Sequence, residues 1–280
     1  MVNAGARDMD KQSKSTIVLI VVFLAGLSLL LYPSVSDYWN SFHSSQAIAD
    51  YTEQVAHLDY AQYEQLWIDA QNFNRKLAER PFLLMLSDAE KKEYNRQLNV
   101  SGSGMMGSIE IPSIKCTLPI YHGTEEAVLQ VAVGHLEGTS LPVGGAGSHC
   151  VLSGHRALPS ARLFTDLDKL VEGDLFLLHI LDETLTYEVD QILIVEPGEV
   201  AALAIEPGQD YCTLVTCTPY GINTHRMLVR GHRVENQSDA SMRVSADALQ
   251  IEPLLVAPLV AVPILLLLLF GMLLHDRKKK

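Results

Sequence analysis

The chain has 280 residues, of which 48% are hydrophobic, and it carries a formal net charge of −12 at pH 7. This length accommodates one domain of about 150 to 200 residues with accessory segments. The acidic excess argues against a nucleic-acid partner, because a protein that binds nucleic acid needs a basic face for the phosphates.

Two uncharged apolar stretches, residues 17–32 and 254–274, are each long enough to cross a bilayer. The first lacks a small-x-small cleavage site, which favours an uncleaved anchor over a cleaved signal peptide. The second ends in the basic run 277–280, which is typical of a stop-transfer segment rather than of a buried core helix. Basic residues outside both spans place both termini in the cytoplasm by the positive-inside rule, so the segment between the spans lies outside the cell.

After the first span, apolar residues repeat at helical spacing over 48–58 and again over 63–77, with a change of phase near Asp59 that predicts a bend. Ser87 and Glu90 form a capping-box pattern, which predicts a short helix to about residue 98. The glycine-rich stretch 101–107 then predicts a flexible joint leading into the main domain.

From residue 108 onward the chain consists of short β-rich runs separated by Gly and Pro, which predicts an antiparallel barrel or sandwich. Two short helical insertions are expected at about 125–133 and 161–170. The β-rich runs are 108–114, 149–155, 174–180, 184–195, 211–217 and 225–234.

The expected extracellular domain contains four cysteines, and the sequence leaves open whether they form disulfides, since that compartment is usually oxidising. A domain of this size does not need such crosslinks, and no Cys/His spacing indicates zinc. Cys116 and Cys150 lie in β-rich runs and are expected to be small core residues. Alternation along 211–217 places Cys212 and Cys217 on opposite faces, with Cys217 at a strand end beside a loop, a common position for a functional group.

A cysteine nucleophile needs a neighbouring base or cation. Arg226 follows Cys217 across a loop of eight residues, and a hairpin there returns its guanidinium alongside the thiol. A guanidinium stays charged and offers a planar set of donors to a developing oxyanion. His155, at the end of another strand, and His225 are rival bases, and spacing alone leaves that choice open.

The segments VLSGHR, TLVTCTPYG and NTHRMLVRG together closely resemble the signature of sortases, specifically the class C or pilin-polymerising group. The resemblance covers about residues 106–234, and two spans around an extracytoplasmic domain fit the same group. The fold that it implies is mainly β, an eight-stranded sortase barrel with short helices, an N-terminal helical lid segment and two transmembrane helices.

The resemblance implies a nucleophile, Cys217, with His155 as the catalytic histidine and Arg226 as the catalytic arginine. Thr216 and His225 are then expected to support the site from neighbouring positions. No metal or other cofactor is expected.

One segment departs from the pattern of class C sortases, whose lid usually carries an Asp-Pro-aromatic motif. Here the lid-like segment is Arg80, Pro81 and Phe82, so the carboxylate is replaced by a guanidinium. If the family's aspartate contacts a cation in the site, Arg80 would repel Arg226, with Glu79 as a potential substitute. We therefore expect a looser or differently latched lid in which Phe82 still plugs the cleft.

The expected organisation follows the chain from one cytoplasmic tail to the other. It comprises a cytoplasmic tail at 1–15, a transmembrane signal anchor at 16–32, a helical segment with the lid at 33–106, the catalytic barrel at 107–235, a linker at 236–253, a transmembrane helix at 254–274 and a basic cytoplasmic tail at 275–280.

The resemblance implies a cysteine transpeptidase in the membrane of a Gram-positive bacterium. Its expected partners are pilin subunits with LPxTG-like C-terminal sorting signals, and the acceptor is a pilin lysine amine. One alternative is a cell-wall-anchoring sortase that uses a peptidoglycan-precursor amine. Another is an inactive membrane-tethered binding module, which the presence of all three catalytic residue types argues against. A papain-like peptidase fits poorly, because its cysteine lies on a helix.

Overall fold

The computed structural model describes residues 3–82, 84–236 and 263, and their side chains from residue 17 onward. The chain divides into two compact units, one of which contains α1 as far as Tyr38, while the other begins at Trp39 and contains the barrel. The expected second span at 254–274 lies outside the described residues apart from residue 263. The helices are α1 (Asn3–Ala56), α2 (Tyr60–Ala78), α3 (Asp88–Tyr94) and α4 (Glu126–Leu129), with 3-10 turns at Pro112–Ile114, Leu167–Lys169 and Ala201–Leu203.

The helix boundaries follow from local sequence signals. Helix α2 begins after Asp59, whose side chain accepts the backbone N–H of Gln62 in a capping box, so the bend expected near Asp59 is confirmed. Helix α3 begins after Ser87, which forms the expected capping box with Glu90. Within the described residues, α1 is the helix that is long and apolar enough to cross a membrane, from Ile17 onward.

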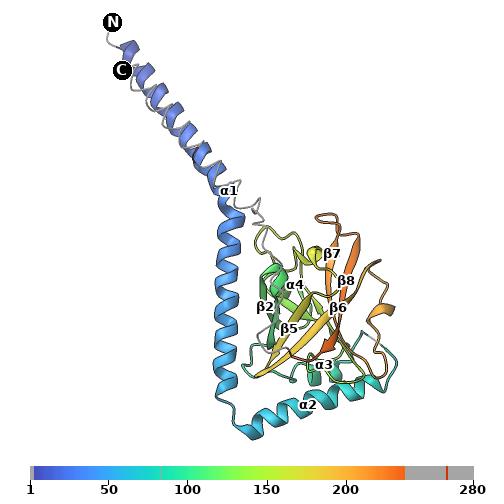
Figure 1. Cartoon of the computed structure of the whole chain (residues 1–280). Coiled ribbons are helices and arrows are strands. Elements are labelled where there is room, and N and C mark those ends of the chain that lie inside the picture. The colour runs from blue at the N-terminus through green and yellow to red at the C-terminus, as the bar shows by residue number, and fades with distance from the viewer. Residues whose placement is uncertain (1–2, 83, 237–262, 264–280) are drawn as a thin grey trace. The chain divides into compact units, whose positions relative to one another are not determined.

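Eight strands close into a barrel, which confirms the expected fold (Figure 1). The strand order around the barrel is β1-β2-β3-β4-β7-β8-β6-β5. The strands are β1 (Met105–Ile111), β2 (Cys116–His122), β3 (Val133–His135), β4 (Ser148–Ser153), β5 (Leu175–Ile180), β6 (Glu183–Val195), β7 (Asp210–Thr218) and β8 (His225–Val234).

The expectation of a wholly antiparallel barrel was wrong for two strand pairs. β2 pairs with β3, and β4 with β7, in parallel. Parallel neighbours require a crossover connection, and between β4 and β7 the chain passes through β5 and β6. Sequence separation cannot reveal such a pairing, which places residues about 60 positions apart next to each other.

The expected helical insertions are shorter in the structure than in the sequence pattern. The first is the single turn of α4, because β3 already begins at Val133. The second is mainly loop, with a 3-10 turn at Leu167–Lys169. The joint at 101–107 also ends earlier than expected, since β1 begins at Met105.

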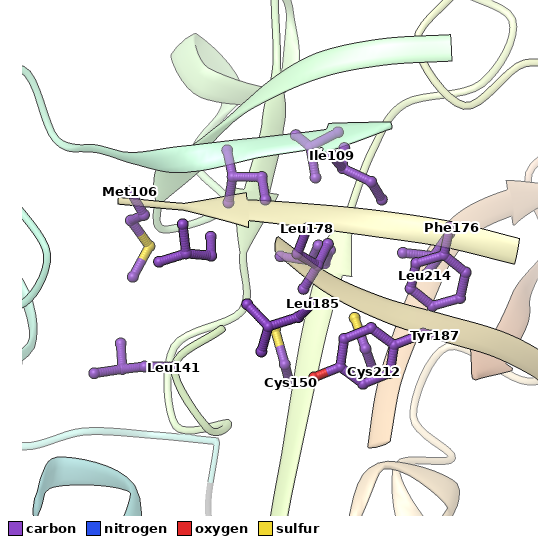
Figure 2. Close-up of a cluster of buried hydrophobic side chains, with 14 of the residues drawn as sticks. Met106, Ile109, Leu141, Cys150, Phe176, Leu178, Leu185, Tyr187, Cys212 and Leu214 are labelled. Carbon is purple, nitrogen blue, oxygen red and sulfur yellow. The ribbon is translucent and has the colours of Figure 1, made fainter. Parts of the chain in front are cut away.

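The barrel interior is apolar, and the helices of the same compact unit extend it. Tyr51 of α1, Phe73 of α2 and Tyr94 of α3 are buried in the same cluster as the inward side chains of the strands. Figure 2 shows Cys150 and Cys212 within this cluster, beside Leu185, Tyr187 and Leu214. The two cysteines are direct partners in the β4–β7 register.

A second apolar cluster covers the opposite face of β4, β7 and β8, and we call it the outer cluster. Side chains alternate along a strand, so Val151 and Val215 point away from the interior that Cys150 and Cys212 occupy. The outer cluster comprises Val151, Leu203 and Leu228, with Phe82, Leu136, Leu193, Val195, Val200, Ala202 and Val215 packed against them.

Candidate active site

Cys217 lies near the end of β7 on the outer face of the barrel. It is partly exposed, whereas Thr216 and Thr218 on either side are buried. Cys217 shares the face of Val215, which belongs to the outer cluster. The thiol is therefore at the end of a rigid strand, next to an apolar surface and beside the loop that follows Thr218.

Arg226 is the direct cross-strand partner of Cys217 in the antiparallel pair of β7 and β8. Side chains of such partners lie on the same face, with their Cβ atoms about 4.5 to 5.5 Å apart. The guanidinium donates to the backbone oxygens of Asn223 (3.3 Å) and His225 (3.1 Å). A guanidinium has five N–H donors, so donors remain for a substrate oxygen.

His155 is brought to the other side of Cys217 by the parallel pairing of β4 and β7. The register pairs Ser153 with Val215, and the backbone N–H of Gly154 donates to the Val215 oxygen at 3.0 Å. Cys217 lies two residues further along β7, and His155 lies two residues beyond Ser153, where β4 ends. The three residues implied by the resemblance therefore come from adjacent chain segments, with Cys217 in the middle.

The environment of His155 includes a carboxylate that the sequence reading did not single out. Nε2 of His155 lies 3.5 Å from Oε2 of Glu126, at the start of α4. The His155 side chain is 27% exposed, and that of Glu126 is 71% exposed. No motif pointed to Glu126, because it lies 29 positions away in the chain, in a different loop.

Thr216 links the histidine segment to the cysteine strand. Its hydroxyl, which is buried, donates to the backbone oxygen of Gly154 at 2.8 Å. Gly154 must be glycine for steric reasons, since an added Cβ would lie 2.6 Å from the ring of Phe164. This hydrogen bond therefore joins Thr216, which precedes Cys217, to Gly154, which precedes His155.

His225 lies on the opposite face of β8 from its neighbour Arg226. It is exposed, and its Nδ1 is 2.9 Å from the hydroxyl of Thr224. The structure thus places Arg226 beside Cys217 and turns the His225 side chain away from that face.

Arg156 is a further residue of this region whose contacts sequence reasoning missed. It is buried, forms an ion pair with Asp168 and donates to the Thr218 hydroxyl at 3.4 Å. Its guanidinium also lies 5.7 Å from the ring centre of Tyr220. Arg156 therefore ties the segment after His155 to the segment after Cys217. The sequence signal that could have pointed to Arg156 is its position directly after His155, at the end of a β-rich run.

The lid-like segment lies between α2 and α3, and Phe82 is half-buried against the outer cluster that includes Val215. Pro81 next to it is exposed. Arg80 forms an ion pair with Glu90 of α3, and Glu90 in turn accepts from Ser87 at 2.8 and 2.6 Å. The guanidinium expected to face Arg226 thus has a carboxylate partner within its own segment, while Glu79 ends α2 as its C-cap.

The other three cysteines have surroundings that differ from those of Cys217. All four cysteines are free thiols. Burial raises the pKa of Cys116 to about 12 and that of Cys212 well above its ordinary value. Cys150 is buried in the barrel interior beside Cys212, as expected for a core residue.

Comparisons with known proteins identify the family and the fold. The sortase domain family matches residues 109–234. Sortase C1 from Streptococcus agalactiae is 52% identical, with 69% of this chain and 100% of that chain covered and a TM-score of 0.67. Sortase C from Streptococcus pneumoniae, described in terms of catalysis and pilin substrate specificity, is 46% identical (69% and 98% covered, TM-score 0.63).

Sortase C from Clostridium perfringens, solved with the C-terminal cell wall sorting motif, is 45% identical to this chain (69% and 100% covered, TM-score 0.61). The likeness covers the full length of these solved chains and 69% of this chain, which is more than the barrel alone. The chain belongs to the sortase family and is a cysteine transpeptidase with class C sortases among its structural neighbours.

Proposed function

We propose that this transpeptidase cleaves an LPxTG-like sorting signal between Thr and Gly and transfers the threonine to a pilin lysine amine. The observation that supports this most directly is the position of Cys217, with Arg226 as its cross-strand partner on one side and the His155 segment on the other. The sortase C structures described with pilin specificity and with a sorting motif support the choice of substrate.

In the first step, the Cys217 thiolate attacks the threonine carbonyl and forms a C–S bond. The carbonyl oxygen becomes an oxyanion, which the guanidinium of Arg226 stabilises. His155 donates a proton to the departing glycine nitrogen as the C–N bond breaks, which leaves a thioester on Cys217 and a free amine.

In the second step, a neutral lysine amine attacks the thioester carbonyl, and His155 accepts the proton that the nitrogen loses. The C–S bond breaks, an isopeptide bond forms and Cys217 is released as the thiolate. Water competes with the lysine for the thioester, so covering the site serves a purpose. The outer cluster beside Cys217 offers an apolar surface for the Leu and Pro of the signal, and Phe82 occupies part of that surface.

The apolar part of α1 is suited to anchor the enzyme in the membrane, with the catalytic unit outside the cell. A second span at 254–274, with both termini in the cytoplasm, completes the proposed topology. Anchoring on the outer surface would bring the site to pilin subunits held in the same membrane.

The test is an acyl-transfer assay with the full chain in detergent. A peptide containing LPxTG is incubated with the enzyme and either a pilin-derived lysine peptide or a peptidoglycan-precursor amine, and mass spectrometry identifies what is joined to the threonine. We expect the lysine conjugate and a thioester on Cys217, both absent in Cys217→Ala. Transfer to the precursor amine alone would assign the enzyme to cell-wall anchoring, and binding without any thioester would identify a binding module.

A further inference from the structure

In the described part of the chain, the Glu126 carboxylate is a charged neighbour of the His155 ring nitrogen Nε2. Oε2 of Glu126 lies 3.5 Å from that nitrogen. Nε2 is shielded from solvent and has no hydrogen-bond partner in the described part of the chain, since the Glu126 oxygen at 3.5 Å makes an ion-pair contact only. A shielded ring nitrogen is most stable when it carries a proton that a nearby acceptor can bind. The carboxylate is such an acceptor.

The carboxylate is itself held in place. Gln130, one helical turn further along, donates from its side-chain amide to Oε1 of Glu126, so the two oxygens of the carboxylate have different neighbours. The hydrogen bond from Gln130, and secondarily the attraction to His155, lower the pKa of the Glu126 carboxyl. Glu126 is therefore ionised at neutral pH.

We propose that Glu126 is a positioning residue for His155: its carboxylate binds the Nε2–H, orients the ring and places a negative charge beside it. This inference rests on the proposed function, in which His155 acts as acid and then as base. With Nε2–H held by Glu126, Nδ1 is the nitrogen that exchanges protons with the reacting groups. Its proton goes to the leaving amine, and it later accepts the proton of the incoming lysine.

The charges around His155 make the contribution of this one carboxylate larger. Cys217 and Arg226 lie on the adjacent strands β7 and β8, and Arg156 follows His155 directly. Arg156 forms an ion pair with Asp168, and this carboxylate compensates the charge of Arg156. A carboxylate next to an imidazole favours the charged ring, and a nearby guanidinium disfavours it. Without Glu126, the ring would lose its carboxylate neighbour, while Arg226 would remain as the cross-strand partner of Cys217.

A matched control lies one residue away on the same turn. Glu125 is also exposed, but its side chain is 3.6 Å from Lys91, which has a second carboxylate partner in Glu137 at 2.9 Å. Replacing Glu125 with Gln therefore removes the same charge from the same turn without removing the partner of His155. Glu126→Gln keeps the shape of the side chain, and Glu126→Asp keeps its charge.

The experiment compares Glu126→Gln, Glu126→Asp, Glu125→Gln and the unmodified full chain in detergent. Two pH profiles are measured, namely kcat/KM for cleavage of an LPxTG peptide and the rate of Cys217 alkylation by iodoacetamide, which needs no substrate. For Glu126→Gln we expect the alkaline limb of kcat/KM to move down by about one pH unit, with kcat lowered roughly 10-fold and KM unchanged. Alkylation at pH 7 should slow several-fold.

Glu126→Asp should recover part of both effects, and Glu125→Gln should follow the unmodified chain. Identical profiles for Glu126→Gln and the unmodified chain would overturn the proposal. An equal shift in Glu125→Gln, or a loss of activity that is uniform in pH, would also overturn it. If the unmodified chain does not cleave the peptide, the alkylation profiles still decide about Glu126, and the proposed substrate alone fails.

Discussion

Cys217 differs from the other three cysteines in its surroundings rather than in its local sequence. Cys212 lies in the same strand, but alternation turns it into the barrel interior, where burial raises its pKa. Cys217 points to the outer face, where Arg226 is its register partner. A single-residue slip of β7 would exchange these faces. The identity of the nucleophile therefore depends on the strand register.

Arg226 is expected to stabilise the oxyanion through its planar set of N–H donors as well as through its charge. Arg226→Lys keeps the charge but removes the planar set of donors, so we predict that kcat/KM for peptide cleavage falls about 100-fold or more. Arg75→Lys on α2, an exposed arginine that contacts Asn72, is the matched control and should change activity less than about 2-fold. A steady-state assay that gives equal activities for both variants would refute the role of Arg226.

At the scale of elements, the segment between α2 and α3 lies against the outer cluster through Phe82. Phe82 packs against this cluster, on the face that carries Cys217. We predict that Phe82→Ala raises the rate of Cys217 alkylation several-fold, because the apolar contact that holds the segment down is lost.

Met85 provides the control for this prediction, because it belongs to the same segment and is 89% exposed. Met85→Ala should leave the alkylation rate unchanged. Peptide mapping confirms that the labelled cysteine is Cys217. Equal alkylation rates in Phe82→Ala and the unmodified chain would show that Phe82 does not restrict access to this thiol.

The Arg80–Glu90 ion pair leads to a second prediction about this segment. Arg80→Asp restores the residue type usual in class C lids, yet here it would place a second carboxylate beside Glu90. Like charges repel at this distance. We therefore predict that Arg80→Asp loosens the segment and speeds Cys217 alkylation, and that Arg80→Asp combined with Glu90→Lys restores the slower rate. Slower alkylation of Cys217 in Arg80→Asp would contradict a role of the Arg80–Glu90 ion pair in holding the segment in place.

At the scale of the whole molecule, stability depends on buried polar groups that connect distant elements. Asn74 of α2 both donates to the backbone oxygen of Leu141 (3.0 Å) and accepts its N–H (2.7 Å). Tyr51 of α1 donates to the Met106 oxygen at 2.8 Å and accepts from the Leu181 N–H at 3.1 Å. Through these contacts α2 and the part of α1 from Trp39 onward belong to the same folded unit as the barrel.

His149 predicts how this stability varies with pH. Nδ1 of its buried ring is 2.9 Å from the Ala204 oxygen, and Nε2 is 2.7 Å from the Thr213 hydroxyl. Burial lowers the pKa of His149 below its ordinary value of 6.5. The unfolded chain therefore binds a proton at higher pH than the folded chain, so stability is retained above pH 6.5 and lost as the pH falls below it.

His149→Gln tests this, since an amide can make both hydrogen bonds but does not titrate. Between pH 7 and pH 5 the free energy of unfolding should fall by about 1 kcal/mol more in the unmodified chain than in His149→Gln. Urea unfolding followed by circular dichroism measures the difference. Parallel pH dependences in the two proteins would exclude His149 as the cause.

The sequence by itself determined the features that depend on neighbouring residues. Capping at Asp59 and Ser87 set the starts of α2 and α3, and alternation separated Cys212 from Cys217, because both effects act within a few positions. The motifs around His155, Cys217 and Arg226 identified the family and implied an eight-stranded barrel.

Only the tertiary structure decided the contacts between distant segments. The parallel β4–β7 pair, the pairing of Arg80 with Glu90, the packing of Phe82 on the outer cluster and the carboxylate of Glu126 beside His155 all depend on it. The physical reason is that these contacts join residues that lie together only in the folded chain. Their energies depend on side-chain distances that no local pattern encodes.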